Sequence, residues 1–170
     1  MNLRGTVAVF GDYVSGDVIL PARYAFLDPE AMTAHVLEEL DPAANERVRR
    51  ADILVAGTAF GYGTGRESSA RALRAAGVKV AIGGPFARMF YRNAINNGLL
   101  VLDCPALVGD GVEDGCEMEI DTVAGKIRCA GRVYAVPPVP DLVNRIVAAG
   151  DLVAYGRSWL RERARGGPNA

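Results

Sequence analysis

The sequence predicts an α/β fold in which a small parallel core carries a β appendage. Three short segments are predicted to be buried strands: Ile53–Ala56, residues 78–82 and residues 99–102. The first is a continuous apolar run, which is typical of a strand buried on both faces. Segments with helical spacing separate these strands, at residues 66–76 and 86–97. This alternation of strands and helices implies parallel pairing with right-handed crossovers.

The elements before this core begin with a strand. Residues 6–10 alternate around valines and predict that strand, and a turn rich in Asp and Gly follows it. Asp28-Pro29 is typical of a helix start, because aspartate caps free N–H groups and proline fits the first turn. The apolar spacing that follows predicts a helix over residues 30–40, and Asp41-Pro42 begins a shorter helix that ends near Arg50.

The elements after the core form the appendage. Three short strands are predicted there: Glu117–Asp121, Lys126–Cys129 and residues 132–136. The first two flank a Gly-containing turn and are expected to form a hairpin. Asp141–Ala149 is expected to be the last helix, and the arginine-rich residues 157–170 are expected to form a solvated tail.

The composition limits the possible function classes. The 170 residues are 50% apolar and 23% charged, which fits one domain. A net charge of −1 argues against binding nucleic acid or a membrane surface through the field of the whole chain. No run reaches 18 apolar residues and no signal peptide is recognisable, so we expect no membrane segment. The three cysteines show no sign of pairing, which fits a reducing cytoplasm.

Histidine and cysteine are too scarce for most metal sites. The candidates are His35, Cys104, Cys116 and Cys129, and no C-x-x-C pair occurs. This spacing excludes a zinc ribbon and argues against an iron–sulfur cluster held by this chain alone. We therefore expect this chain to bind no metal, His35 to be a surface or satisfied helix histidine and Cys104 to be a small buried residue.

A glycine-rich loop at residues 57–65 is the strongest local signal for a binding site. It follows a buried strand and precedes a helix, which is where open parallel sheets place their ligands. The N–H groups of such a helix start attract anions, and Gly63 and Gly65 let a ligand approach the backbone. Arg66 adds a planar guanidinium group, which binds a carboxylate through two parallel hydrogen bonds.

A nucleotide-binding domain is an alternative function for this loop. Gly61 and Gly63 begin a G-x-G-x-x-G motif, but Arg66 stands at the third glycine position. The acidic residue expected after the next strand is also absent, since that strand ends in Ile82-Gly83-Gly84. A nucleotide- or small-molecule-binding module thus stays open as a non-enzyme hypothesis, as does a purely structural partner subunit.

Three ordered motifs give the chain a specific resemblance. They are Gly11-Asp12 with Asp17 and Pro21-Ala22-Arg23-Tyr24; residues 52–57 with Phe60-Gly61-x-Gly63 and Arg66-Glu67; and residues 86–99 with Phe90-Tyr91-Arg92-Asn93. In this order they resemble the small subunits of 3-isopropylmalate dehydratase and homoaconitase over residues 5–152. The resemblance implies an aconitase-type swivelling β/β/α domain, which we place at residues 1–156, so that the arginine-rich residues 157–170 follow it as a tail.

The family implies a hydro-lyase component that is active only with a large subunit. That partner is expected to hold a [4Fe–4S] cluster, one iron of which acts as Lewis acid on the leaving hydroxyl, whereas this chain binds no cofactor. The substrate would be a small hydroxy dicarboxylate, isomerised by dehydration and rehydration as in leucine biosynthesis.

The resemblance also assigns roles to individual residues. The catalytic base of the family, a serine, falls on Thr64, which keeps a hydroxyl. Arg66 is expected to hold a substrate carboxylate and Arg23 a second one, while Asp17 supports the site. Asn93, with Arg88, Arg92 and Asn96 on the same stretch, is expected to brace the glycine-rich loop or to meet the large subunit.

The loop after Arg23-Tyr24 bears on the choice of substrate. Phe26 and Leu27 suit an apolar group such as isopropyl, worth about 1–3 kcal/mol per buried group. The simpler interpretation is that both residues pack on the following helix. Another hydroxy acid, homoaconitate-like or dimethylmalate-like, remains an alternative substrate.

Overall fold

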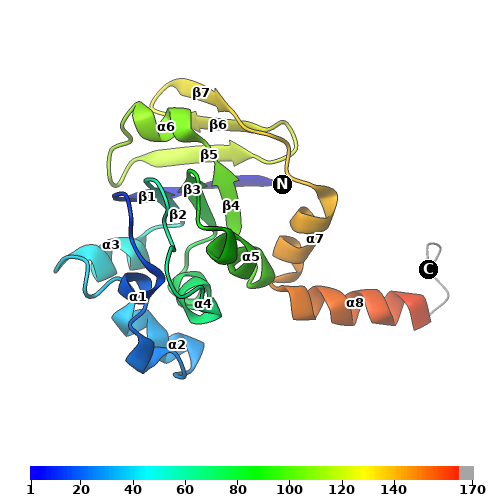
Figure 1. Ribbon diagram of the computed structural model, residues 1–170. Helices are drawn as coiled ribbons and strands as arrows, with labels where there is room; N and C mark the ends of the chain where they lie inside the picture. The colour runs from blue at the N-terminus through cyan, green and yellow to red at the C-terminus, as the bar shows by residue number, and fades with distance from the viewer. Residues whose placement is uncertain (165–170) are drawn as a thin grey trace.

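One seven-stranded sheet organises residues 1–164, which the computed structural model describes (Figure 1). The strand order is β4-β3-β2-β1-β5-β6-β7. The strands are β1 (Asn2–Phe10), β2 (Ile53–Ala56), β3 (Val80–Gly83), β4 (Leu100–Asp103), β5 (Glu117–Asp121), β6 (Lys126–Cys129) and β7 (Arg132–Ala135). Strands β1, β2, β3 and β4 pair parallel to one another. Strand β1 also pairs antiparallel with β5, and β5, β6 and β7 continue the antiparallel pairing. The predicted parallel core and β appendage are both confirmed.

Strand β1 joins the two halves of the sheet. Its first residues, 2–6, pair antiparallel with β5, and its last residues, 7–10, pair parallel with β2. Because two partners share one strand end to end, the sheet curls here, and β5–β7 form an upper layer over the parallel strands (Figure 1).

Two hydrophobic cores lie on opposite faces of the parallel strands. Alternation along each strand sends Leu54 and Ala81 into one core and Val55 and Ile82 into the other. The first core packs against α1 (Gly16–Ile19), α2 (Pro29–Met32), α3 (Ala44–Arg50), α4 (Glu67–Ala75) and α5 (Arg88–Asn96). The second contains side chains of β5, β6, α6 (Pro105–Gly109) and α7 (Asp141–Ala149). Burial on both faces explains why β2 and β3 are apolar at every position.

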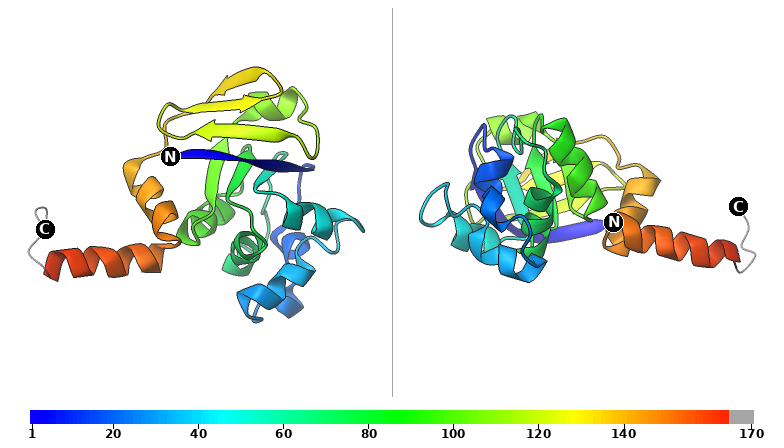
Figure 2. Two further views of the ribbon diagram at one scale, coloured as in Figure 1. Left: turned by 180° about the vertical axis from the view of Figure 1, so that it is seen from behind. Right: turned by 60° about the horizontal axis from the view of Figure 1, so that its bottom comes forward.

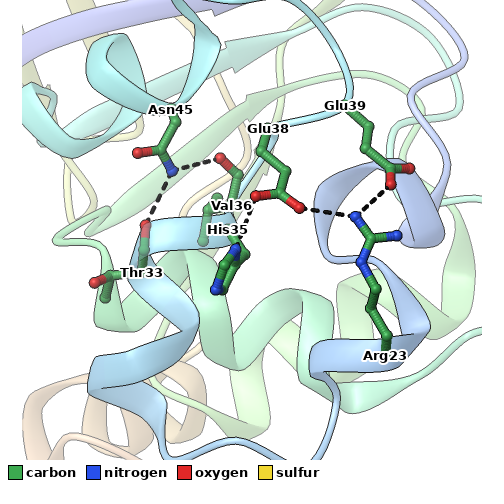
Figure 3. A network of polar contacts seen from close by, with 7 residues as sticks. All are labelled: Arg23, Thr33, His35, Val36, Glu38, Glu39 and Asn45. Atoms are coloured by element: carbon green, nitrogen blue, oxygen red, sulfur yellow. Dashed lines mark hydrogen bonds and ion pairs between the residues drawn. The ribbon is translucent and has the colours of Figure 1, made fainter.

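The helix predicted over residues 30–40 is wrong beyond its first turn. The chain forms α2 and a 3₁₀ turn, η2 (Thr33–His35), and then leaves helical geometry, with Val36 at ψ 123° and Leu37 at φ 57°. Both Val36 and Leu37 are fully buried, and the Leu37 N–H donates to the Ile19 carbonyl. The Asn45 amide donates to two carbonyls freed by this turn, those of Thr33 and Val36 (Figure 3).

The carboxyl-terminal segment contains one helix more than predicted. After α7, Gly150 at φ 100° ends the helix, and the Asp151 carboxylate accepts from the Ala154 N–H to begin α8 (Leu152–Ala164). Helix α8 projects away from the sheet (Figure 2), and its residues 157–164 are exposed, so within this stretch the tail is helical. The division into a domain at 1–156 and a tail at 157–170 stays a prediction, since residues 165–170 lie outside the described part.

None of the helices between residues 1 and 164 combines the length and the apolar character needed to cross a bilayer.

Candidate functional site

Three loops meet at the carboxyl ends of the parallel strands. The loop after β1 pairs with the loop after β2, because the N–H groups of Tyr13 and Gly61 donate to the Thr58 and Val14 carbonyls, both at 2.8 Å. The loop after β3 joins them through Ala59, whose N–H donates to the Pro85 carbonyl at 2.8 Å. The glycine-rich loop is thus held by hydrogen bonds to the loops that follow β1 and β3.

Gly61 is the position where this loop depends most clearly on glycine. Its φ is 78°, and a Cβ placed there would stand 2.3 Å from the Phe90 ring. Phe90 packs edge-to-face on the buried Phe60, with ring centroids 5.4 Å apart. The loop backbone therefore lies directly on the aromatic cluster beneath it.

The predicted residues Asp17 and Arg66 form an ion pair in the site. Asp17 lies in the first turn of α1, and its Oδ1 accepts from Arg66 Nη1 at 2.5 Å. Both side chains remain half exposed, at 47% and 41%. The Ser69 hydroxyl fixes the two helices to each other by donating to the Gly16 carbonyl at 2.8 Å. The guanidinium is therefore oriented by Asp17 while part of it faces solvent.

Thr64 lies next to the first turn of α1, which contains Asp17. A Cβ built on Gly16, next to Asp17, would stand 4.0 Å from the Thr64 hydroxyl oxygen, so this hydroxyl lies over the start of α1. Thr64 and Gly63 are exposed, and Gly63 and Gly65 have φ values of 101° and 64°. The hydroxyl and the guanidinium thus share one open surface.

Two asparagines support the loop from below, Asn93 of α5 and Asn97 at the carboxyl-terminal cap of this helix. Asn93 Nδ2 donates to the Gly65 carbonyl at 2.9 Å, as expected of a residue that braces the loop. Asn97 Nδ2 donates to the Glu67 carboxylate at 2.9 Å and to the Asn93 carbonyl at 2.8 Å. The sequence analysis missed Asn97, although its i, i+4 spacing from Asn93 places it on the same helix face.

Arg23 is held by a separate acidic network (Figure 3). Its Nη2 contacts the Glu38 and Glu39 carboxylates at 2.9 and 2.8 Å, and its guanidinium lies 4.6 Å from the centre of the Tyr24 ring. Hydrogen bonding to Tyr24 and Glu39 raises the pKa of Arg23 above its ordinary value. The sequence analysis missed both glutamates, which the turn at Leu37 brings to Arg23.

His35 belongs to this network and stacks on Tyr24. The two ring centroids are 3.6 Å apart, and His35 Nδ1 lies 2.8 Å from a Glu38 oxygen. This hydrogen bond is the main cause of the lowered pKa of the Glu38 carboxyl. His35 is therefore satisfied, as predicted, although it lies in the 3₁₀ turn η2 and not in an α-helix.

Phe26 and Leu27 project from the loop behind Arg23. Phe26 is 98% exposed, so the interpretation that it packs on the following helix is wrong, and Leu27 is 37% exposed. Arg71 of α4 supports this loop, with Nη2 at 3.5 Å from the Ala25 carbonyl. A fully exposed phenyl ring is available to contact an apolar group brought to this surface.

The cysteines do not form a cluster site. Cys104 is buried, 3% exposed, as predicted, while the sulfurs of Cys116 and Cys129 lie 3.6 Å apart in the antiparallel half. Across residues 1–164, no group of three or more His, Cys, Asp or Glu side chains is placed to hold a metal ion. The donor set of the described residues does not fit a [4Fe–4S] cluster.

Comparison with known proteins identifies the family. A family model described as the aconitase C-terminal domain matches residues 27–107. A protein from Caldicellulosiruptor bescii named 3-isopropylmalate dehydratase small subunit is 40% identical over 167 residues, covering 96% of this chain and 100% of that one. The chain belongs to the 3-isopropylmalate dehydratase small-subunit family.

Further members of the family agree in sequence and fold. A relative from Methanopyrus kandleri, named 3-isopropylmalate dehydratase small subunit 1, is 44% identical and covers 89% of this chain and 90% of its own length. A crystal structure of 3-isopropylmalate dehydratase from Methanocaldococcus jannaschii has a TM-score of 0.87 at 33% identity, covering 98% of this chain and 100% of that one. The predicted aconitase-type swivel fold and the assignment as a hydro-lyase component are confirmed.

Proposed function

We propose that this chain is the small subunit of an enzyme that isomerises 3-isopropylmalate by dehydration and rehydration. The observation that carries the proposal is the Asp17–Arg66 ion pair beside the exposed Thr64 hydroxyl, on an edge built by three loops. Such a surface supplies a proton acceptor and a carboxylate clamp and is open on the side where a second protein would close it.

Thr64 is the proposed base. Its Oγ1 takes the proton from the substrate carbon next to the carbon that bears the hydroxyl, and returns a proton during rehydration. The positive charge of Arg66 nearby favours the alkoxide form of the hydroxyl. Such proton transfer contributes about 10²–10⁴-fold to a rate.

Arg66 and Arg23 are the proposed carboxylate ligands. Arg66 is pre-oriented by Asp17, so its planar fork loses little freedom when it binds a substrate carboxylate. The loop backbone at Gly63 and Gly65 has no side chain to obstruct the substrate. Arg23 would exchange one of its two glutamate partners for the second carboxylate.

Phe26 and Leu27 favour an apolar substituent on the substrate. Burying an isopropyl group against the exposed Phe26 ring is worth about 1–3 kcal/mol, whereas an extra carboxylate placed against this ring would lose part of its hydration. This contrast favours 3-isopropylmalate over homoaconitate-like substrates.

The remaining part of the proposed active site belongs to a large subunit. The donor set of residues 1–164 does not fit a [4Fe–4S] cluster, and the family resemblance assigns that group to the partner. We further propose that the complex acts in the cytoplasm. The contribution of this chain is to bind the carboxylates and to move the proton.

Reconstitution tests the proposal directly. The chain is co-expressed with candidate large subunits under anaerobic conditions, and hydration of the unsaturated acid derived from 3-isopropylmalate is followed by its loss of ultraviolet absorbance. We expect turnover in the complex and none with either subunit alone. Absence of a complex with every candidate would contradict the pairing.

Two controls separate the alternatives. The unsaturated acids of homocitrate and dimethylmalate, assayed in the same complex, identify a divergent hydro-lyase if either reacts faster. Calorimetry of the isolated chain with NAD tests the nucleotide-binding hypothesis, and we expect no heat of binding.

A further inference from the structure

The antiparallel half of the molecule contains a pair of neighbouring thiols. Cys129 ends β6 and pairs with Met118 of β5, and Cys116 lies two residues before Met118, directly before β5 begins. The two sulfur atoms are 3.6 Å apart although their residues are separated by 13 positions. Their proximity follows from the register in which β5 pairs with β6.

The two thiols differ in their access to solvent. Cys129 is 5% exposed, whereas Cys116 is partly exposed. Both line a surface pocket of about 270 Å³, which is also lined by Asp110, Arg132 and Tyr134. A small reagent in this pocket reaches Cys116 first and finds Cys129 directly behind it.

We propose that Cys116 and Cys129 are a modification site that forms a reversible intrachain disulfide by exchange with a small-molecule disulfide such as oxidised glutathione. In the first step the Cys116 thiolate attacks one glutathione sulfur, the glutathione S–S bond breaks, and one glutathione thiolate leaves. In the second step the Cys129 thiolate attacks Cys116 Sγ and releases the second glutathione. Two protein thiols are oxidised and one glutathione disulfide is reduced to two thiols.

The surroundings of Cys116 set the rate of this exchange. Burial and the neighbouring Cys129 raise the pKa of the Cys116 thiol to about 11, and the nearby Glu113 carboxylate acts in the same direction. The other charged or titratable groups at the pocket are Asp110, Arg132 and Tyr134. Since the thiolate is the attacking species, we expect slow exchange at neutral pH that accelerates as the pH rises.

The disulfide would stabilise the hairpin that contains both cysteines. The sulfurs must approach from 3.6 Å to about 2.05 Å to form the bond. The bond closes a short loop of the unfolded chain around β5 and β6, and it thereby reduces the entropy gained on unfolding. This inference does not depend on the proposed function, because the thiol pair is in the antiparallel half and the candidate site is at the carboxyl ends of the parallel strands.

Incubation of the full chain in a buffer of oxidised and reduced glutathione tests the proposal. We expect the free thiols to fall from three to one per chain, and digestion without reductant to yield a peptide that joins Cys116 to Cys129. The midpoint of thermal unfolding should rise by several degrees and return after reduction. Peptide mapping of the wild-type chain is decisive without any variant.

Matched variants identify the cysteines that react. A Cys104→Ala chain should still form the bond, and a Cys129→Ser chain should stop at a glutathione adduct on Cys116. Three free thiols after prolonged incubation at alkaline pH, or a disulfide that contains Cys104 in the folded wild-type chain, would overturn the proposal.

Discussion

The parallel and antiparallel halves of the sheet differ in where they place polar side chains. In the parallel half, the loops after β1 and β2 gather Asp17, Thr64 and Arg66 on one open edge. In the antiparallel half, the strands are joined by tight turns, and Asp110 pairs with Arg132 beside the thiol pair. Parallel strands need long connections, and these connections supply the loops from which a site is built. The antiparallel half supports the second core and holds β1 in place.

Replacing Thr64 with alanine should have the largest effect on the proposed function. In the reconstituted enzyme, Thr64→Ala removes the base, and we expect kcat to fall about 10²–10⁴-fold with unchanged thermal stability. Thr64→Ser keeps the hydroxyl and serves as the matched control, which should retain most activity. Equal activity in all three proteins would remove Thr64 from the chemistry.

Glycine replacements compare the two halves by stability. Gly61→Ala forces a Cβ into Phe90 at a positive φ, and it should lower the free energy of unfolding by roughly 2–5 kcal/mol. Gly131, in the turn between β6 and β7, has a similar φ of 76° but open space around it, so Gly131→Ala should cost only about 1 kcal/mol. Denaturant unfolding of both variants measures the difference, and equal losses would show that contact with Phe90 is unimportant.

Arg66→Lys tests the carboxylate clamp at constant charge. A lysine ammonium lacks the planar fork, so a bidentate hydrogen bond to the substrate is lost. Losing a charge-assisted hydrogen bond of about 1.5–3 kcal/mol should lower kcat/KM roughly 10–150-fold. Steady-state kinetics of the complex check this, with Arg74→Lys on the same helix as the control. Unchanged kinetics in Arg66→Lys would contradict the clamp.

The ion pair between Asp52 and Lys79 should give the smallest effect. Its N–O distance is 2.7 Å, and hydrogen bonding to Lys79 holds the pKa of Asp52 below its usual value. The folded-state pKa is lower, so the contribution is present above the unfolded pKa of about 4 and is lost as the pH falls through the folded value. Because both groups are at least one-third exposed, Lys79→Met should cost under about 1 kcal/mol, measured as a weaker pH dependence of unfolding in acid. Turnover should not change.

The sequence predicts the parallel core well because β2 and β3 are buried on both faces and β4 is buried up to its last residue. Apart from Asp103 at the end of β4, the residues of β2, β3 and β4 carry no charged or polar side chain, and the apolar residues of the helices between these strands have helical spacing. The prediction of a helix over residues 30–40 is wrong because the burial of Leu37 in the first core outweighs the local helical preference. Helices α6 and α8 were not predicted, since α6 is a single short turn and α8 has no apolar face buried against the sheet.

The candidate site was predictable only where a motif carried it. The motifs name Asp17 and Arg66, and the structure pairs them. The partners of Arg23 were not predictable, because Glu38 and Glu39 reach it only through the turn at Leu37. The exposure of Phe26 likewise depends on where that loop leaves the body of the protein.

Hydrogen exchange of the chain with and without a large subunit tests the central claim most directly. On this account, one part of a shared active site lies in the loops at the carboxyl ends of the parallel strands. Amides in residues 11–17 and 57–66 should therefore exchange more slowly in the complex. Amides of β6 and β7 should exchange as they do in the free chain. Protection confined to β6 and β7, with both loops unaffected, would contradict the account.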